Sequence, residues 1–170
     1  MDIFPISLKL QQQPCLIVGG GHIAYRKAVL LQKAGAAVHV ISPEIAANLL
    51  EIVEQSGGKY VQTLFNTGLK LRDYRLVIAA TDDKAVNQAV FEACEAENVL
   101  VNSVDDPPHC RFMVPAIIDR SPLVVSIATN GASPVLSRQI RTQLESSIPH
   151  GMGKLAEFSG KWRAAVKAKI

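Results

Sequence analysis

The ten residues Cys15-Leu16-Ile17-Val18-Gly19-Gly20-Gly21-His22-Ile23-Ala24 set the architecture of this chain. Their first four form an apolar run, which predicts a buried parallel strand. The pattern GxGxxA follows, in which Gly19 permits a tight turn, Gly21 lets the backbone approach a pyrophosphate, and Ala24 allows close contact between helix and strand. A helix predicted over 22–33 offers free amides and the positive end of its dipole to phosphate. The stretch therefore predicts a dinucleotide site, against the alternative of a glycine-rich turn without a ligand.

The residues after this turn alternate between strands and helices. Short apolar runs predict four further strands, the second of them weak, at residues 37–41, 59–62, 76–80 and 99–102. Helical patterns fill two of the gaps, over 45–55 and from Asp82, as N-cap, to about Glu97. Unbroken apolar strands that alternate with helices are typical of a parallel sheet covered on both faces. We therefore predict an α/β, Rossmann-type domain over residues 1–112.

The pattern changes after Asn102. Two strands are predicted, over 112–118 and 123–128, with a turn between them. Ser133-Pro134 is a strong helix start, a Ser cap followed by Pro at the first helical position, and that helix should reach about Ser146. A break over 149–153 precedes a final amphipathic helix. We therefore expect a small α+β segment over 113–147 and the start of a helical domain over 148–170, cut short at its end.

Composition excludes several classes of protein. The net charge of +3 is too weak to argue for nucleic acid, and aromatic residues are few. No apolar stretch reaches the roughly 18 residues that span a bilayer, and the N-terminus lacks the features of a signal peptide. The three cysteines are widely spaced and show no zinc or disulfide pattern, which fits a reducing, cytoplasmic location. The last helix could also lie on a membrane surface, but docking on the core is the favoured interpretation.

The end of the second strand bears on the choice of cofactor. An acidic residue that binds ribose is expected there, but the strand ends in Ser42-Pro43-Glu44, with no acid at the tip itself. Glu44 could still reach a ribose, so NAD and NADP both stay open. Because no Arg stands there to receive a 2′-phosphate, NAD is the predicted cofactor. Thr81, after the fourth strand, is expected at the same edge, although it could simply cap the next helix.

Polar residues follow the fifth strand, at the edge of the sheet where ligands bind in this class of fold. They run Asn102-Ser103-Val104-Asp105-Asp106-Pro107. A carboxylate there could accept a proton while a hydride leaves to nicotinamide, although paired acids can also be plain surface residues. His109-Cys110 lie nearby, but two adjacent residues without spaced partners do not predict a metal site.

Taken in order, these motifs resemble the precorrin-2 dehydrogenase/sirohydrochlorin ferrochelatase module of siroheme synthases. The matching stretches are 15–21, Ala24 with Arg26-Lys27-Ala28, 79–83, 102–105, 115–123 and 131–136. The likeness covers nearly the whole chain, and the last three stretches are far more specific than the glycine motif.

This resemblance implies NAD-dependent oxidation of precorrin-2 to sirohydrochlorin, followed by insertion of ferrous iron to give siroheme. It implies that Asp105 serves both steps as the catalytic acid–base group, and that no protein metal ligand is needed. It also implies a homodimer formed through the segment from Met113 to about Ser146. In many relatives a uroporphyrinogen methyltransferase domain follows. The predicted cofactor contacts are Gly19, Gly21, His22, Ile23, Pro43, Glu44, Thr81 and Asn102.

A polycarboxylate substrate makes several arginines candidates for substrate binding, namely Arg111, Arg120, Arg138 and Arg141. Three alternatives stay open: a non-catalytic NAD-sensing domain, a dehydrogenase for another metabolite, and a dehydrogenase without chelatase activity. The residues 102–105 and the Ser133-Pro134 helix favour the enzyme, because a sensor needs neither.

Overall fold

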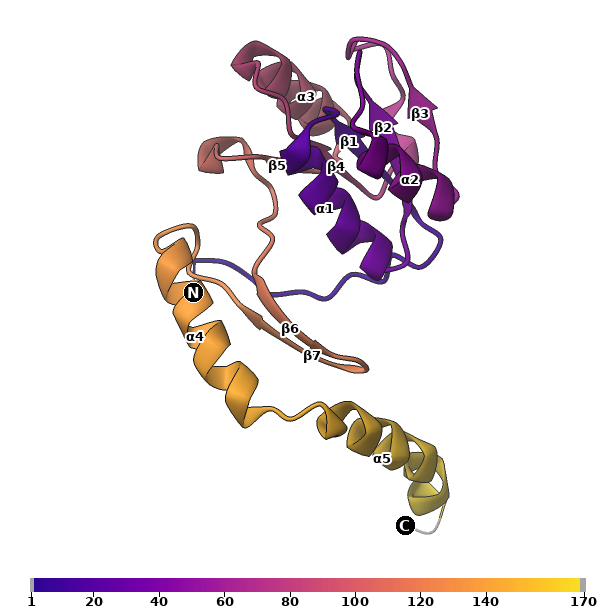
Figure 1. The fold of residues 1–170 in the computed structure, drawn as a ribbon, viewed down its shortest axis with the longest axis vertical. Helices are drawn as coiled ribbons and strands as arrows, with labels where there is room; N and C mark the ends of the chain where they lie inside the picture. The colour runs from indigo at the N-terminus through magenta and orange to yellow at the C-terminus, as the bar shows by residue number, and fades with distance from the viewer. Residues whose placement is uncertain (1, 169–170) are drawn as a thin grey trace. The chain divides into compact units, whose positions relative to one another are not determined.

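The computed structural model describes residues 2–168, which separate into two compact units (Figure 1). We call Phe4–Phe112 the sheet unit. Residues 113–168, with the first N-terminal residues, form the hairpin unit. The last helix belongs to the same unit as the segment before it. The division into three parts stays a prediction.

The sheet unit is built on a parallel sheet of five strands in the order β3-β2-β1-β4-β5. The strands are β1 (Pro14–Val18), β2 (Ala37–Ile41), β3 (Tyr60–Val61), β4 (Leu76–Ala79) and β5 (Leu100–Ser103). The chain adds strands on one side of β1 and then crosses to the other side at β4. Ligands bind at such a switch point, outside the carboxyl ends of the strands. The predicted α/β, Rossmann-type sheet is confirmed.

Helices cover both faces of this sheet, because side chains along a strand alternate between faces. Cys15 and Ile17 pack with buried residues of α1 (His22–Lys33) and α2 (Ala47–Gln55). Leu16 and Val18 point the other way and pack with α3 (Lys84–Glu97) and the 3₁₀ turn η1 (Leu71–Asp73). The continuous apolar runs of the sequence thus correspond to strands buried on both sides.

Two helix starts differ from the sequence prediction. The N-cap of α3 is Asp83 and not Asp82: its Oδ1 accepts hydrogen bonds from the amides of Ala85 and Val86, at 2.8 and 3.3 Å. Helix α2 begins at Ala47 rather than at Ile45, because Ala46 is extended and its amide donates to the Gly20 carbonyl at 2.9 Å. That bond fixes the chain after β2 against the glycine turn.

The hairpin unit pairs β6 (Ala116–Arg120) with β7 (Leu123–Ile127) in antiparallel fashion and adds α4 (Pro134–Ser147) and α5 (Gly151–Lys167). Ser133 caps α4 as predicted, since its Oγ accepts from the Leu136 amide at 3.2 Å. Helix α5 starts inside the predicted break. A Cβ on Gly153 would lie 2.4 Å from the Arg120 carbonyl oxygen, so this glycine permits close packing instead of ending the helix.

None of the helices in the described part of the chain is both long and apolar enough to cross a membrane. The thiols of Cys15 and Cys94 are buried and free. Burial raises the pKa of Cys15 to about 11 and that of Cys94 to about 12, so both stay protonated.

Candidate functional site

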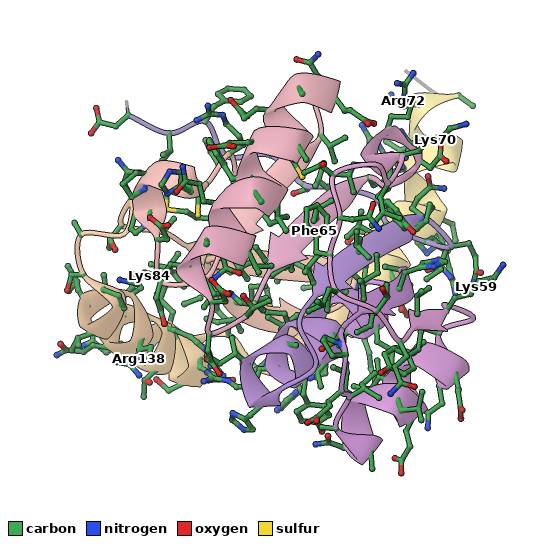
Figure 2. All side chains as sticks on the ribbon, turned by 90° about the horizontal axis from the view of Figure 1, so that it is seen from above. Lys59, Phe65, Lys70, Arg72, Lys84 and Arg138 are labelled. Carbon is green, nitrogen blue, oxygen red and sulfur yellow. The ribbon has the colours of Figure 1, made fainter. Side chains whose placement is uncertain are left out.

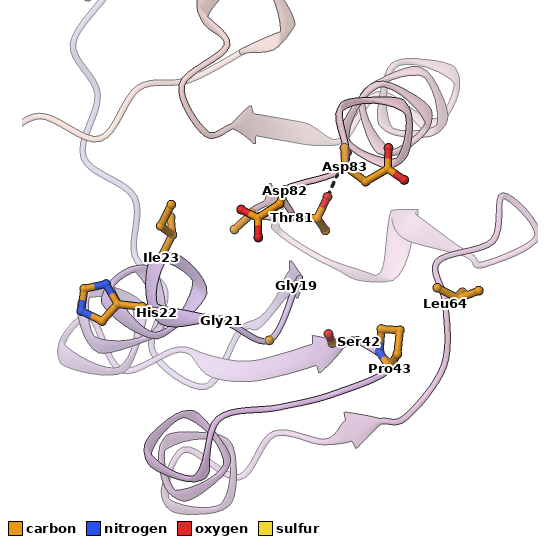
Figure 3. A pocket seen from close by; sticks show the side chains of 12 residues that line it. Gly19, Gly21, His22, Ile23, Ser42, Pro43, Leu64, Thr81, Asp82 and Asp83 are labelled. Atoms are coloured by element: carbon orange, nitrogen blue, oxygen red, sulfur yellow. Dashed lines mark hydrogen bonds between the residues drawn. The ribbon is translucent and has the colours of Figure 1, made fainter.

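A crevice of about 540 Å³ opens at the carboxyl ends of β1, β2 and β4 (Figure 3). Its volume falls within the range typical of cofactor sites. It is lined by Gly19, Gly20, Gly21, His22, Ile23, Ser42, Pro43, Leu64, Ala80, Thr81, Asp82 and Asp83. The crevice lies at the switch point of the sheet.

The three positions of the turn differ in whether packing within the chain requires a glycine there. Gly19 has φ +125, and a Cβ there would lie 2.3 Å from the Ala80 carbonyl oxygen. A Cβ on Gly20 would lie 1.8 Å from the Glu44 carbonyl oxygen. Both are therefore required by backbone packing within the chain. A Cβ on Gly21 would meet nothing within 4 Å, so packing within the chain does not require a glycine here, and the space beside it is open to a ligand.

The helix that begins at this turn has a free N-terminus. Gly21 is the N-cap of α1, no side chain caps the helix, and its first turn carries no acid. The unpaired amides and the helix dipole therefore suit an anion such as pyrophosphate. The neighbouring α3 differs, because the Asp83 carboxylate already occupies its N-terminus.

The tip of β2 and the loop after β3 form one side of the crevice. Ser42 is buried, while Pro43 and Leu64 line the opening (Figure 3). Leu64 is 69% exposed, a large apolar side chain that the fold itself does not bury. Sequence reasoning missed it because the stretch 63–73 has no periodic pattern.

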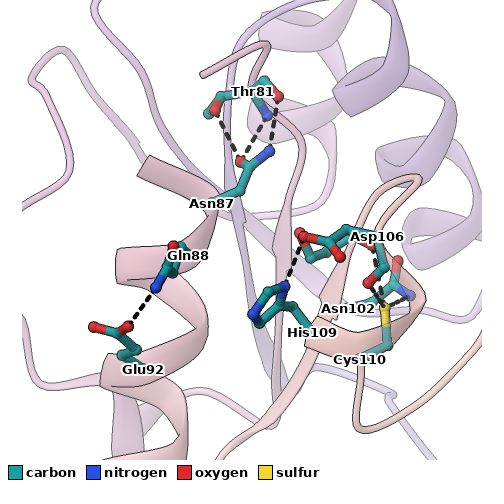
Figure 4. A network of polar contacts seen from close by, with 9 residues as sticks. Thr81, Asn87, Gln88, Glu92, Asn102, Asp106, His109 and Cys110 are labelled. Carbon is teal, nitrogen blue, oxygen red and sulfur yellow. Dashed lines mark hydrogen bonds and ion pairs between the residues drawn. The ribbon is translucent and has the colours of Figure 1, made fainter. Parts of the chain in front are cut away.

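Thr81 lines the crevice from the end of β4, and its side chain is bonded within the chain. Its Oγ1 lies 2.8 Å from Asn87 Oδ1 (Figure 4) and 3.0 Å from the Asp83 carbonyl oxygen (Figure 3). The Asn87 amide returns a bond to the Thr81 carbonyl at 2.9 Å. Asn87, which no sequence pattern singles out, thus fixes the end of β4 to the first turn of α3.

Asn102, at the end of β5, does not line the crevice. Its Nδ2 donates to the Phe112 carbonyl at 3.0 Å and to Cys110 Sγ at 3.3 Å. Its Oδ1 is buried and has no hydrogen-bond partner among the described residues. Leaving a buried acceptor unsatisfied is costly, so this oxygen retains the capacity to accept one further N–H donor.

Asp105 follows β5 in an exposed turn and takes a left-handed backbone conformation, φ +58. None of the hydrogen bonds or ion pairs among the described residues involves its carboxylate. The adjacent Asp106 is bonded to His109, with 2.7 Å between Oδ2 and Nδ1. Burial and the charge of Arg26 lower the pKa of Lys27 on α1, and the charges of Asp105 and Cys110 oppose that shift. Lys27 therefore lies within electrostatic reach of Asp105.

Most of the candidate substrate arginines are already occupied within the fold. Arg111 pairs with Glu95, Arg120 Nε donates to the Ile148 carbonyl at 3.1 Å, and Arg141 lies 3.3 Å from Glu145. Arg138 is exposed on α4, and among the residues described it has no ion pair (Figure 2).

The structure therefore brings most of the predicted cofactor residues together in the crevice: Gly19, Gly21, His22, Ile23, Pro43 and Thr81. Glu44 is exposed and does not line it, nor does Asn102. The role of each as a cofactor contact stays a prediction. No group of three or more His, Cys, Asp or Glu residues within 2–168 is arranged to hold a metal ion.

Comparisons with known proteins agree with this geometry. Residues 6–116 match the model of an NAD(P)-binding family, and residues 120–147 match that of the sirohaem biosynthesis protein central segment. The siroheme synthase of Acinetobacter baylyi is 67% identical over all of this chain, which spans 37% of that protein. That of Chromobacterium violaceum is 50% identical over all of the chain, which spans 36% of it. The chain thus spans little more than a third of the curated relatives it matches.

One solved structure is also similar over most of the chain. SirC, a precorrin-2 dehydrogenase, superimposes with a TM-score of 0.79 and 26% identity, covering 95% of this chain and 79% of its own. These matches confirm the resemblance predicted from the sequence and the predicted nicotinamide-dinucleotide cofactor.

Proposed function

We propose that this chain, which belongs to the NAD(P)-binding family matched by its residues 6–116, oxidises precorrin-2 to sirohydrochlorin with NAD as hydride acceptor. The observation that carries the proposal is the placement of Asp105. Its carboxylate, which has no hydrogen bond or ion pair among the residues described, follows β5 on the edge of the sheet where the open glycine turn follows β1. Only β4 separates these two strands, so strand spacing puts the two loops about 10 Å apart.

The residues of the crevice support one direction for the bound dinucleotide. The free N-terminus of α1 receives the pyrophosphate beside Gly21. The adenosine half extends toward β2, since the ribose-binding position of this fold follows that strand, and Pro43 and Leu64 give that side an apolar surface. The nicotinamide half then extends toward β4 and β5, the side on which Asp105 lies.

Dehydrogenation removes a hydride and a proton from the substrate. Bound NAD supplies the hydride acceptor. The carboxylate of Asp105 accepts the proton, because it is exposed and none of the hydrogen bonds or ion pairs among the described residues occupies it. Its neighbour Asp106 is less suited, since it is engaged by His109.

The lining of the crevice supports NAD over NADP. Among the described residues that line it, there is no Lys or Arg to neutralise a 2′-phosphate. A 2′-phosphate on the β2 side would therefore lack a compensating cation.

Insertion of ferrous iron into sirohydrochlorin is the second activity that we propose, with the metal as a substrate. The reaction releases two pyrrole protons, and a base must accept them. Asp105 is favoured again, because it is exposed beyond the dinucleotide crevice and can be reached by a large planar substrate. A dehydrogenase without chelatase activity is the alternative, and the iron step below separates the two.

The predicted partners also stay proposals. Exposed apolar residues on β7 and α4 support a homodimer through 113–147, and they are Val124, Val135, Leu136 and Leu144. The greater length of the curated relatives is consistent with fusion to a methyltransferase domain. A cytoplasmic location is likewise a prediction.

The test compares the full chain with Asp105→Asn and with Asp73→Asn, a matched change at an exposed acid on η1. Precorrin-2 turnover with NAD is followed by absorbance, NAD affinity is measured separately, and ferrous iron is then added to sirohydrochlorin. We expect Asp105→Asn to reduce turnover about 10²- to 10⁴-fold at unchanged NAD affinity, while Asp73→Asn has no effect. A wild-type chain that binds NAD but leaves precorrin-2 unchanged would support the NAD sensor instead.

A further inference from the structure

Two adjacent acids after β5 are held in different ways. Asp105 is exposed and adopts φ +58, a conformation that Asp tolerates but that side chains rarely adopt. Such a conformation persists where the surrounding structure fixes it. Since the Asp105 carboxylate has no bonding partner among the described residues, the constraint comes from its neighbours in the segment 103–110, which we call the β5 loop.

The Cys110 thiol closes the β5 loop around Asp105 (Figure 4). Its Sγ lies 3.1 Å from the Ser103 carbonyl oxygen and 3.3 Å from that of Asp106, so the two acceptors stand on either side of Asp105 in the chain. Burial raises the pKa of the Cys110 thiol, which therefore stays protonated and able to donate. The thiol also receives a hydrogen bond from Asn102, which joins the loop to the end of β5.

The His109 ring holds the other acid and attaches the loop to α3. Its Nδ1 lies 2.7 Å from Asp106 Oδ2. The ring packs edge-to-face on Phe91 of α3, with 4.9 Å between centroids. The Arg111 guanidinium lies over the Phe91 ring, 5.0 Å from its centroid, and pairs with Glu95. Phe91 thus contacts the residues on both sides of Cys110, His109 within the loop and Arg111 just after it.

We infer that His109 and Cys110 are positioning residues, which hold the β5 loop so that Asp105 alone presents a free carboxylate to the substrate. The single S–H of Cys110 donates to one or the other of the two carbonyls that flank Asp105, and His109 retains Asp106. This inference rests on the proposed role of Asp105. Neither residue belongs to the stretches that carry the resemblance to siroheme synthases, so the resemblance does not assign them this role.

The test uses matched pairs of variants. Cys110→Ala removes the donor and Cys110→Ser restores one, while His109→Ala removes the ring nitrogen and His109→Asn places an amide nitrogen near it. We expect each Ala variant to lower kcat about tenfold or more, because small misplacements of a reacting group are costly. We expect the Ser and Asn variants to stay within about threefold of wild type, with the KM for NAD unchanged in all of them.

A double variant separates positioning from a general loss of structure. If Cys110 acts through Asp105, then Cys110→Ala has no further effect on the residual rate of Asp105→Asn. Additive losses in that double variant, or full turnover by the Ala variants, would overturn the inference.

Amide exchange of residues 104–106 provides a readout that does not depend on activity. We expect faster exchange in Cys110→Ala than in Cys110→Ser, and equal exchange would count against the inference. If wild type and Asp105→Asn show equal turnover while exchange differs as expected, the proposed function fails and the role of Cys110 in holding the loop stands.

Discussion

The glycine turn at 19–21 and the β5 loop lie on the same edge of the sheet, yet they differ in how their polar groups are bonded. The turn leaves the N-terminus of α1 without a cap, and Gly21 faces open space. The β5 loop is closed by its own side chains, through Cys110 and His109. The first region leaves backbone donors unpaired, as a bound anion requires. The second is held by bonds within the chain, although the buried Ser103 Oγ has no hydrogen-bond partner among the described residues.

This difference follows from what each region must do. A dinucleotide carries its own charge and hydrogen-bond acceptors, so the protein needs only donors and space to bind it. A proton acceptor must stand at one place relative to the substrate, because rate depends steeply on geometry. Substitutions in the glycine turn should therefore affect NAD affinity and unfolding free energy at different positions. Substitutions in the β5 loop should change the loop's structure and the turnover rate together.

The largest effect is expected at Gly19, where the turn is held by the chain itself. Gly19→Ala should cost at least about 3 kcal/mol of unfolding free energy, because it adds a clash with the Ala80 carbonyl to an unfavourable φ. Gly57→Ala is the matched control, since Gly57 has φ +74 but no neighbour within 4 Å. That control should cost about 1–2 kcal/mol in denaturant unfolding. If the two variants lost equal unfolding free energy, Gly19 would not lie in tight contact with the Ala80 carbonyl at the end of β4.

Gly21→Ala should have the second largest effect, on binding instead of folding. A Cβ there meets no protein atom, so the unfolding free energy should fall by about 1 kcal/mol or less. NAD affinity should fall about tenfold or more, because the pyrophosphate must approach this backbone. Titration calorimetry measures both this variant and Gly151→Ala, an equally open glycine outside the crevice. Unchanged NAD affinity would show that the turn is not the phosphate site.

Helix α3, which Asp83 caps, can be compared directly with the uncapped α1. Asp83→Ala should lower the unfolding free energy by about 1 kcal/mol, because it removes the acceptor for two amides of α3. Asp82→Ala also removes a carboxylate from the crevice lining but takes no cap away, and it should change stability by less than about 0.5 kcal/mol. If Asp82→Ala proved the more destabilising, the assignment of the cap would be wrong.

The smallest effect is expected at Leu64. Leu64→Ala should leave stability unchanged, because the side chain is 69% exposed, and should weaken NAD binding about three- to tenfold through lost apolar contact. Nicotinamide mononucleotide, which lacks the adenosine half, should bind equally well to both proteins. A matched change at Leu155, 55% exposed on α5, should affect neither ligand. Loss of mononucleotide affinity in Leu64→Ala would place the adenosine half elsewhere.

The features that follow from local pattern could be predicted from the sequence. Continuous apolar runs identified β1 and β4 because both are buried on two faces. The glycine turn was identifiable because a strand and a helix flank it. The Ser133 cap was equally local, since its bond spans only three residues.

Some features were not predicted because they depend on contacts between residues far apart in the sequence. Others depend on which of two adjacent, chemically identical residues takes a role. Asp82 and Asp83 are alike in sequence, and only the position of the first helical turn selects the second as cap. Gly153 reads as a helix breaker until the close approach of the β6–β7 turn is known. His109-Cys110 carried no pattern, because their partners come from β5, from α3 and from within the β5 loop.

The hairpin unit has one further consequence, which concerns proteolysis. Among its described residues, Ile118 is the single large apolar side chain that is fully buried. A region with so little apolar burial opens locally at low free energy, and a protease acts on the open form. The connection between α4 and α5 should therefore be cut long before the sheet unit, and its half-life should lengthen as the chain becomes more concentrated if two copies cover each other's exposed residues.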